Sequence, residues 1–311
     1  KRGTVICMPI INIYGFLNYS REVPDGKDVN RSFPGSKNGS LASRVAYHLT
    51  HDVIPYIDYG IDFHTGGAMR TNYPQIRCVM AEEKNVELAS AFHAPFTIDS
   101  PFRPHSIRQT AARHGKNIIV YEGGESLRFD QQAIEEGVNG TLRLMKHLKM
   151  IDWAPDPKQE NKIIWNSTWA RARHAGLFQS AINCGDLVHK NQIVGTITDP
   201  FGEFKEQVKS PSTGYVVGLN NHPVVNVGDA LLHIGMDNFC KIDGGGDDII
   251  VQNGGIFTLA SNANGPVFSP ATATANINTG GMLKLSATGL TGAGSGVNAN
   301  SYIYQNASVL E

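Results

Sequence analysis

The sequence has little charge for its length, and the charge is unevenly spread. Of 311 residues, 18% are charged, with 27 Lys and Arg against 28 Asp and Glu, so the net charge is −1. Between Ile249 and Leu310 the only charged residue is Lys284. A net charge near zero argues against a nucleic-acid-binding protein and against a polybasic membrane-surface protein, because both usually have a basic excess. We therefore predict no nucleic-acid partner and no membrane partner.

Long hydrophobic runs and paired cysteines are also missing. The longest apolar run, 5–17, is interrupted by Pro9 and Asn12 and is too short to span a bilayer. The four cysteines are widely separated: Cys7, Cys78, Cys184 and Cys240. Without a C-x-x-C pair they indicate neither a zinc knuckle nor a disulfide framework, and they favour the reducing cytoplasm as the location.

Residues 1–152 alternate between strand-like and helix-like segments. Apolar, β-branched runs predict strands at 59–63, 75–80 and 117–121, and a buried strand leading into a loop at 4–13. Apolar residues at helical spacing predict helices at 40–52, 81–92, 106–114 and 130–148. This alternation predicts an α/β fold with a mixed, largely parallel sheet flanked by helices. In such a sheet, ligands bind beyond the carboxyl ends of the strands.

The character of the sequence changes twice after residue 152. Residues 153–161 contain Pro and Lys and are predicted to be a linker. Residues 162–236 contain short β runs separated by regular turns, which predicts a small all-β domain. Residues 237–311 form a low-charge, Gly-, Asn- and Thr-rich, β-prone tail whose origin the sequence does not reveal.

Two short motifs at loops and strand ends contain candidate functional side chains. His64 follows an apolar strand and precedes small residues, so its ring can reach a cleft, with Asp62 as a hydrogen-bonding partner. Asn30 and Arg31 are adjacent in the Gly- and Pro-containing loop 25–35, where they offer an amide and a carboxylate-binding fork. The simpler alternatives are a structural histidine and a solvated loop with an Asx turn.

A third motif is Glu122, at the end of the apolar strand 117–121. A carboxylate in that position is partly desolvated, which suits a general base. The simpler alternative is a loop carboxylate that caps a helix. Each motif is weak alone, and their order and spacing are more informative.

In that order and spacing the chain resembles the succinylglutamate desuccinylase/aspartoacylase family, relatives of the zinc carboxypeptidases. The resemblance spans roughly residues 1–235 and includes the loop 25–35, the His64 segment and the Glu122 segment. It implies a zinc-carboxypeptidase-like catalytic domain over 1–152 and a β domain of barrel-sandwich type over 162–236. It also implies a zinc-dependent hydrolase of an amide bond, an N-acyl amino acid deacylase, with Zn²⁺ as cofactor.

The resemblance also assigns roles around the reacting bond. His64 is implied as a zinc ligand, and Glu122 as the general base that activates a zinc-bound water. Glu125, three residues further on, is the runner-up for the base.

For substrate binding, the resemblance points to the long loop that precedes the first helix. Arg21 is implied to polarise the scissile carbonyl and stabilise its oxyanion. Arg31, with Asn30 beside it, is implied to bind a substrate carboxylate. The expected partner is therefore a small molecule with a carboxylate.

The metal site departs from the family pattern. Catalytic zinc needs three protein ligands and a water, and the family supplies two of them from a His-Gly-x-Glu motif. No such motif occurs here, because His114-Gly115 is not followed by Glu at the required position. We therefore expect an N-terminally truncated chain that binds zinc poorly and is inactive in this form.

Two other functions were weighed. In the first, the chain is a non-catalytic module whose Asn30-Arg31 loop binds acidic ligands and whose tail docks to a partner. In the second, residues 162–236 form a biotinyl or lipoyl carrier domain, which requires a modifiable Lys at a hairpin tip. The corresponding segment, 211–214, reads Pro-Ser-Thr-Gly and contains no Lys, which argues against the carrier domain.

Overall fold

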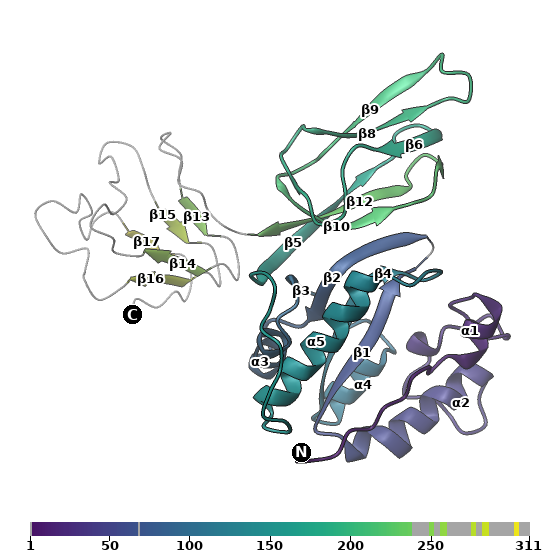
Figure 1. Ribbon diagram of the computed structural model, residues 1–311, viewed down its shortest axis with the longest axis vertical. Coiled ribbons are helices and arrows are strands. Elements are labelled where there is room, and N and C mark those ends of the chain that lie inside the picture. The colour runs from purple at the N-terminus through teal and green to yellow at the C-terminus, as the bar shows by residue number, and fades with distance from the viewer. Residues whose placement is uncertain are drawn as a thin grey trace, which may run out of the picture. The chain divides into compact units, whose positions relative to one another are not determined.

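The protein is described by a computed structural model in two units, Lys1–Asp237 and Asn238–Glu311. The structure describes residues 2–67, 69–237, 249–251, 256–259, 275–277, 282–285 and 302–304. Within these residues, no helix combines the length and the apolar character needed to cross a lipid bilayer. Most of the candidate functional residues lie in the first unit, which Figure 1 shows with its helices beside the twisted strands.

The first unit is built on an eight-stranded mixed sheet. Its strands are β1 Tyr59–Gly66, β2 Arg70–Cys78, β3 Phe96–Asp99, β4 Asn117–Glu125, β5 Lys162–Arg171, β7 Leu187–Val188, β10 Gly214–Asn220 and β12 Ala230–Asp237. They lie in the order β1-β4-β2-β3-β5-β12-β10-β7. Only β1–β4, β2–β3 and β3–β5 pair in parallel. The predicted α/β class with a mixed sheet is confirmed. Among β1 to β4, two of the three pairings are parallel and β2–β4 is antiparallel, whereas β5, β12, β10 and β7 pair antiparallel with one another.

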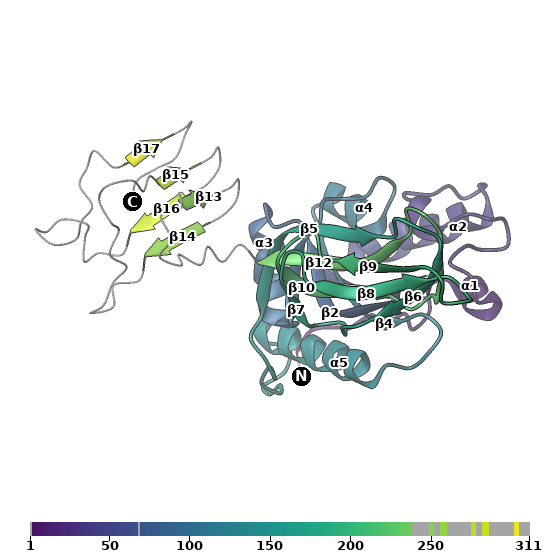
Figure 2. The same ribbon diagram turned by 90° about the horizontal axis from the view of Figure 1, so that it is seen from above.

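Helices cover both faces of the sheet. The helical segments are α1 Ile13–Asn18, η1 Val29–Arg31, α2 Leu41–His48, η2 Leu49–Val53, η3 Ile54–Tyr56, α3 Glu83–Phe92, α4 Ile107–Arg113 and α5 Gln131–His147. Successive residues of β4 face opposite ways: Ile118 packs with α2 and α4, and Ile119 packs with α3 and α5. Figure 2 shows α2 and α4 on one side of the strands and α5 on the other.

The four predicted helices in this unit are confirmed to within about two residues, and polar caps explain the starts of two of them. Ser106 accepts the Gln109 N–H at the start of α4, and Asp130 accepts the Ala133 N–H at the start of α5. Side-chain caps of this kind satisfy amides that have no partner inside the helix.

The predicted buried strand at 4–13 is wrong. The chain forms no strand there, α1 begins at Ile13, and the side chains of Val5 and Ile6 are 60% and 48% exposed. A segment of apolar, β-branched composition forms a strand only where another strand offers hydrogen bonds. No described strand pairs with this segment. Strand β3 was not predicted, and β2 begins five residues earlier than predicted.

Residues 162–237 add antiparallel strands to the same sheet and form a second, smaller one. The second sheet has the order β11-β6-β8-β9, with β6 Gly176–Ser180, β8 Ile193–Thr198, β9 Lys205–Lys209 and β11 Val224–Val225. Because β10 also pairs with β2, the run β2-β3-β5-β12-β10 closes on itself. The β strands therefore continue directly from the α/β part, and the predicted division of this unit into two domains stays a prediction.

The second unit contains five short described strands. They are β13 Ile249–Val251, β14 Ile256–Leu259, β15 Ala275–Ile277, β16 Met282–Leu285 and β17 Tyr302–Tyr304. The strands β13, β15 and β17 form one parallel sheet, and β14 pairs in parallel with β16. The prediction of a β-prone tail is confirmed at these positions, and the rest of the tail, with Cys240, lies outside the described residues.

Candidate functional site

The carboxyl ends of β1 and β4 place two of the predicted site residues side by side. The strands are parallel, and His64 is the direct register partner of Glu122. Paired residues on neighbouring strands point to the same face, so an imidazole and a carboxylate meet at the sheet edge where α/β proteins bind ligands.

His64 is held by the carboxylate of Asp62, its predicted partner. Its Nε2 lies 2.8 Å from Asp62 Oδ2, and both side chains are largely buried. Burial lowers the pKa of His64, but the charge and hydrogen bond of Asp62, together with Glu122, outweigh burial and raise it above its ordinary value. Arg21 acts in the opposite direction on the same pKa, which places its guanidinium within electrostatic range of the ring.

Glu122 is oriented by two side chains of the neighbouring strand β2. Asn72 Nδ2 donates to Glu122 Oε2 over 2.6 Å, and Arg77 Nη2 lies 3.1 Å from the same oxygen. Within the described residues, no hydrogen bond or ion pair reaches Oε1. One carboxylate oxygen is therefore fixed and charge-neutralised, while the other remains able to accept a proton.

Glu125 occupies a different environment at the end of β4. Its register partner is Gly66 rather than His64. Its carboxylate is buried, and the exposed Arg128 approaches its Oε2 to 2.5 Å at Nε, although neither oxygen has a well-oriented hydrogen bond in the described residues. The geometry thus brings Glu122, and not Glu125, to His64, while the role of either residue stays a prediction.

The substrate-binding residues predicted in the long loop are distributed over its length. Arg21 Nε pairs with Asp28 Oδ2 at 2.8 Å, and Asp28 Oδ1 in turn accepts the Asn30 N–H at the start of η1. Asn30 Oδ1 accepts the Ile107 N–H over 2.9 Å, so this amide anchors the loop to α4. Arg31 is exposed, and its guanidinium donates to the Asn30 carbonyl over 2.6 Å.

The charge of Arg21 acts on the pKa of His64, lowering it, whereas no contact joins Arg31 to His64 or Glu122 in the described part of the chain. The clamping role predicted for Arg31 therefore stays a prediction, and it requires a ligand that reaches the exposed side of η1.

Three polar residues near Glu122 were missed by sequence reasoning. Asn72 and Arg77 contact it directly from β2. Arg108, on α4, is 6% exposed and donates to the carbonyls of Pro101 and Arg77, and its charge acts on the same network. Burial lowers the pKa of Arg108 from its ordinary value. One sequence signal was present, because Arg108 shares the buried helix face of Ala111, three residues later.

The described residues do not fit a catalytic zinc site. Zinc requires three protein ligands, and no group of three His, Cys, Asp or Glu side chains that could hold a metal is found in the described residues. His64 Nε2 is engaged by Asp62, and Glu122 Oε2 by Asn72 and Arg77. In the described residues, the imidazole of His64 alone is therefore not enough to hold a catalytic zinc ion.

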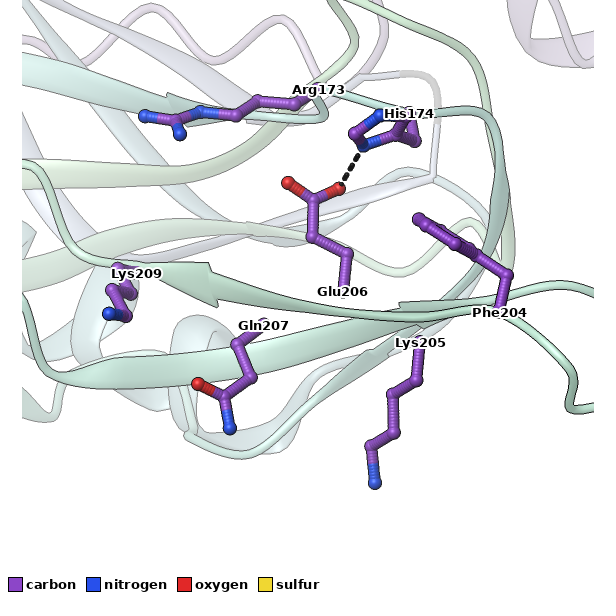
Figure 3. Close-up of a pocket in the computed structure, with 7 residues that line it drawn as sticks. All are labelled: Arg173, His174, Phe204, Lys205, Glu206, Gln207 and Lys209. Carbon is purple, nitrogen blue, oxygen red and sulfur yellow. Dashed lines mark hydrogen bonds and ion pairs between the residues drawn. The ribbon is translucent and has the colours of Figure 1, made fainter.

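A separate hollow of about 570 Å³ lies beside strand β9 of the smaller sheet (Figure 3). It is lined by Arg173, His174, Phe204, Lys205, Glu206, Gln207 and Lys209. Figure 3 shows Glu206 pointing to His174, with Nδ1 to Oε2 at 2.6 Å, while Lys205 and Gln207 point to the other side of β9. The cations of this hollow therefore do not converge on one ligand position.

Comparison with known proteins agrees with this fold. Residues 1–148 match the model of the succinylglutamate desuccinylase/aspartoacylase catalytic domain. The N-alpha-acetyl-L-2,4-diaminobutyric acid deacetylase of Halomonas elongata is 26% identical over 247 residues, which are 74% of this chain and 71% of that protein.

Two solved structures share the fold. One is a succinylglutamate desuccinylase/aspartoacylase from Rhodobacter sphaeroides, with a TM-score of 0.67, 23% identity and coverage of 74% of both chains. The other is the product-bound ectoine utilization protein EutE (DoeB) from Ruegeria pomeroyi, with a TM-score of 0.65, 20% identity and coverage of 73% of both chains. Residues 1–148 are therefore similar to the succinylglutamate desuccinylase/aspartoacylase catalytic domain, and the likeness in fold extends over 74% of the chain.

Proposed function

We propose that this chain contains the substrate-binding and general-base part of a hydrolase that cleaves the amide bond of a small, carboxylate-bearing N-acyl amino acid. The observation that supports it is the pairing of Glu122 with His64 at the carboxyl edge of the sheet, with Arg21 in electrostatic range. The Halomonas elongata relative, a deacetylase of an acetylated amino acid, supports the same reaction class.

In this proposal Glu122 is the general base. Its Oε2 is held by Asn72 and Arg77, so that the carboxylate keeps one orientation while Oε1 takes a proton from the attacking water. Arg21 stabilises the oxyanion that forms on the scissile carbonyl. Arg31 binds the substrate carboxylate on the exposed side of the loop.

We also propose that the complete reaction requires zinc, with His64 as one ligand. The described residues provide no full ligand set, so we expect this chain to bind zinc weakly and to be inactive in this form. A cytoplasmic location remains a further prediction from the separated cysteines.

The substrate class is tested by isothermal titration with N-acetyl-L-alanine and with its uncharged amide, N-acetyl-L-alaninamide. We expect the carboxylate to bind more tightly, and Arg31→Ala to weaken its binding about tenfold while leaving the amide unchanged. The exposed Arg173→Ala variant serves as the matched control. Equal binding of the two compounds by the wild-type protein would contradict the proposed substrate class.

The metal and activity parts are tested on the same protein. After dialysis against zinc, elemental analysis should find well below one zinc per chain, and amine release from the N-acyl compound should stay at the background rate. One firmly held zinc that is lost in His64→Ala would support a complete site and refute the expected inactivity.

The second candidate is a binding module that retains the substrate pocket without hydrolysis. The shortage of metal ligands in the described residues favours it. The two candidates differ in one outcome: a binding module binds N-acyl amino acids but shows no zinc-stimulated amine release under any condition. The partner-docking role of the tail concerns residues that lie mostly outside the described part.

A further inference from the structure

A second hollow lies at the start of β2. Its volume is about 220 Å³, and its lining residues are Arg70, Asn220, His222, Val224, Asn226 and Asp229. The connection between β10 and β12 is fixed there by Asn221, whose backbone N–H donates to the Met69 carbonyl over 2.9 Å. The Asn221 amide also donates to Thr71 Oγ1 over 2.7 Å, so the wall of the hollow is tied to β2.

The hollow and the candidate base share one face of β2. Side chains two residues apart in a strand point to the same face and are separated by about 7 Å, so Arg70 is the next side chain along from Asn72. Asn72 hydrogen-bonds Glu122 over 2.6 Å. A small ligand at Glu122 can therefore extend along β2 into the hollow.

The turn between β1 and β2 brings this arginine close to the catalytic edge. A Cβ on Gly66 would lie 2.0 Å from the Arg70 carbonyl oxygen, so the approach of the two strands depends on glycine at this position. Arg70 thus follows His64 by six residues in the chain but returns to the same edge of the sheet.

Arg70 is prepared for binding an anion. Its guanidinium carbon lies 5.9 Å from the centre of the Trp169 ring, and Trp169 stacks in parallel on His233 at 4.3 Å. Within the described residues Arg70 has no ion-pair partner. The acidic residue of the hollow, Asp229, already accepts the Asn226 N–H at its Oδ2 over 2.8 Å. An unpaired guanidinium supported on an aromatic ring is a planar fork suited to a carboxylate.

We propose that this hollow is a specificity subsite in which Arg70, supported by Trp169, binds a carboxylate on the far end of the substrate. This inference rests on the proposed function, because it extends the same site from Glu122 towards β10. Arg31 belongs to a different element, η1, so in this proposal the two arginines bind different groups of one ligand.

The test compares N-acetyl-L-glutamate with N-acetyl-L-glutamine, which differ only in the distal carboxylate, by isothermal titration against the whole chain. The wild-type protein should bind the glutamate compound about tenfold more tightly. Arg70→Gln should remove this preference and leave binding of the glutamine compound within about twofold. Arg70→Lys, which keeps the charge but loses the fork, should retain part of it.

Two controls separate this subsite from the rest of the site. Arg173→Gln, in the other hollow of the β region, should leave the preference intact. Arg31→Ala should weaken both compounds equally, because both contain the same α-carboxylate. Unchanged thermal melting of each variant would show that binding losses are local.

Each alternative outcome has a definite meaning. A preference that survives Arg70→Gln, with the Arg31 effect intact, overturns the subsite and leaves the proposed function standing. Failure of the wild-type protein to bind either compound overturns both. Tighter binding of N-acetyl-L-2,4-diaminobutyrate that Asp229→Asn abolishes would show that the hollow selects a cation, and would also overturn the proposal.

Discussion

The buried histidine beneath Arg70 and Trp169 makes the protein sensitive to acid. His233 lies in β12, is 5% exposed, and its Nδ1 has no hydrogen-bond partner in the described residues. Burial, assisted by the positive charge of Arg77, lowers the pKa of His233 to about 3. The folded protein therefore keeps this imidazole neutral at pH values where the unfolded chain protonates it.

The size of the effect follows from linkage between protonation and folding. An unfolded histidine titrates near pH 6.5, so below that pH the unfolded chain binds a proton that the folded chain excludes. The free energy of unfolding then falls by about 1.4 kcal/mol per pH unit as the pH drops towards the folded pKa. Between pH 7 and pH 4.5, His233 alone should reduce the free energy of unfolding by about 2–3 kcal/mol.

Urea unfolding of the wild-type protein and of His233→Phe, each at pH 7.0 and pH 4.5, measures this contribution. The phenyl ring keeps the stack on Trp169 but cannot be protonated, so the pH-dependent loss should be smaller in the variant by about 2–3 kcal/mol. His189→Gln, an exposed histidine of the same region, should lose as much stability as the wild-type protein. Equal losses in the wild-type protein and His233→Phe would refute the reasoning.

Three further substitutions test the core and the candidate base. Gly140→Ala would ordinarily stabilise a helix interior, but the added Cβ would lie 2.1 Å from the Phe92 ring. Urea unfolding should therefore show that the free energy of unfolding falls by about 1–3 kcal/mol. An increase in the free energy of unfolding would contradict the packing. Arg143→Met should reduce the free energy of unfolding by about 3–5 kcal/mol, because it leaves the Glu136 carboxylate buried without its partner. In the same assay, a reduction below about 1 kcal/mol would contradict this expectation. In a chain supplied with a His-Gly-x-Glu motif, Glu122→Gln should keep N-acyl amino acid binding within about twofold but lower hydrolysis by about 10²–10⁴, and titration together with amine release separates the two; an unchanged rate would contradict the role of Glu122 as the base.

The helices were predictable from sequence because their ends are encoded locally. Ser106 and Asp130 are caps whose side chains bond backbone amides three residues later, and such caps depend little on the rest of the fold. The strand predicted at 4–13 was wrong for the opposite reason. A strand depends on a neighbour that composition does not reveal, and Val5 and Ile6 remain exposed without one.

The candidate site was predictable where a single motif lies at the end of one strand. His64 and Glu122 each follow an apolar run, and their parallel register brings them together as strand-end residues. Asn30 was found by position, but its contact with the Ile107 amide shows an anchoring bond that no local pattern indicates. The burial of Arg108 was not predicted, because in a sequence a charged residue on a buried helix face resembles a surface residue.

The contacts that the sequence did not predict are made mostly by residues of strand β2. It pairs with β4, β3 and β10, so one strand belongs both to the α/β sheet and to the closed β region. Asn72 and Arg77 reach the candidate base from it, while Arg70 reaches the second hollow from the same strand. A division of the sequence at the linker 153–161 separates this strand from β10, although the two are hydrogen-bonded in the fold. The proposed subsite would make substrate selection depend on residues after 162 as well as on His64 and Glu122, because Arg70 and the other lining residues of the hollow come from both parts of the chain.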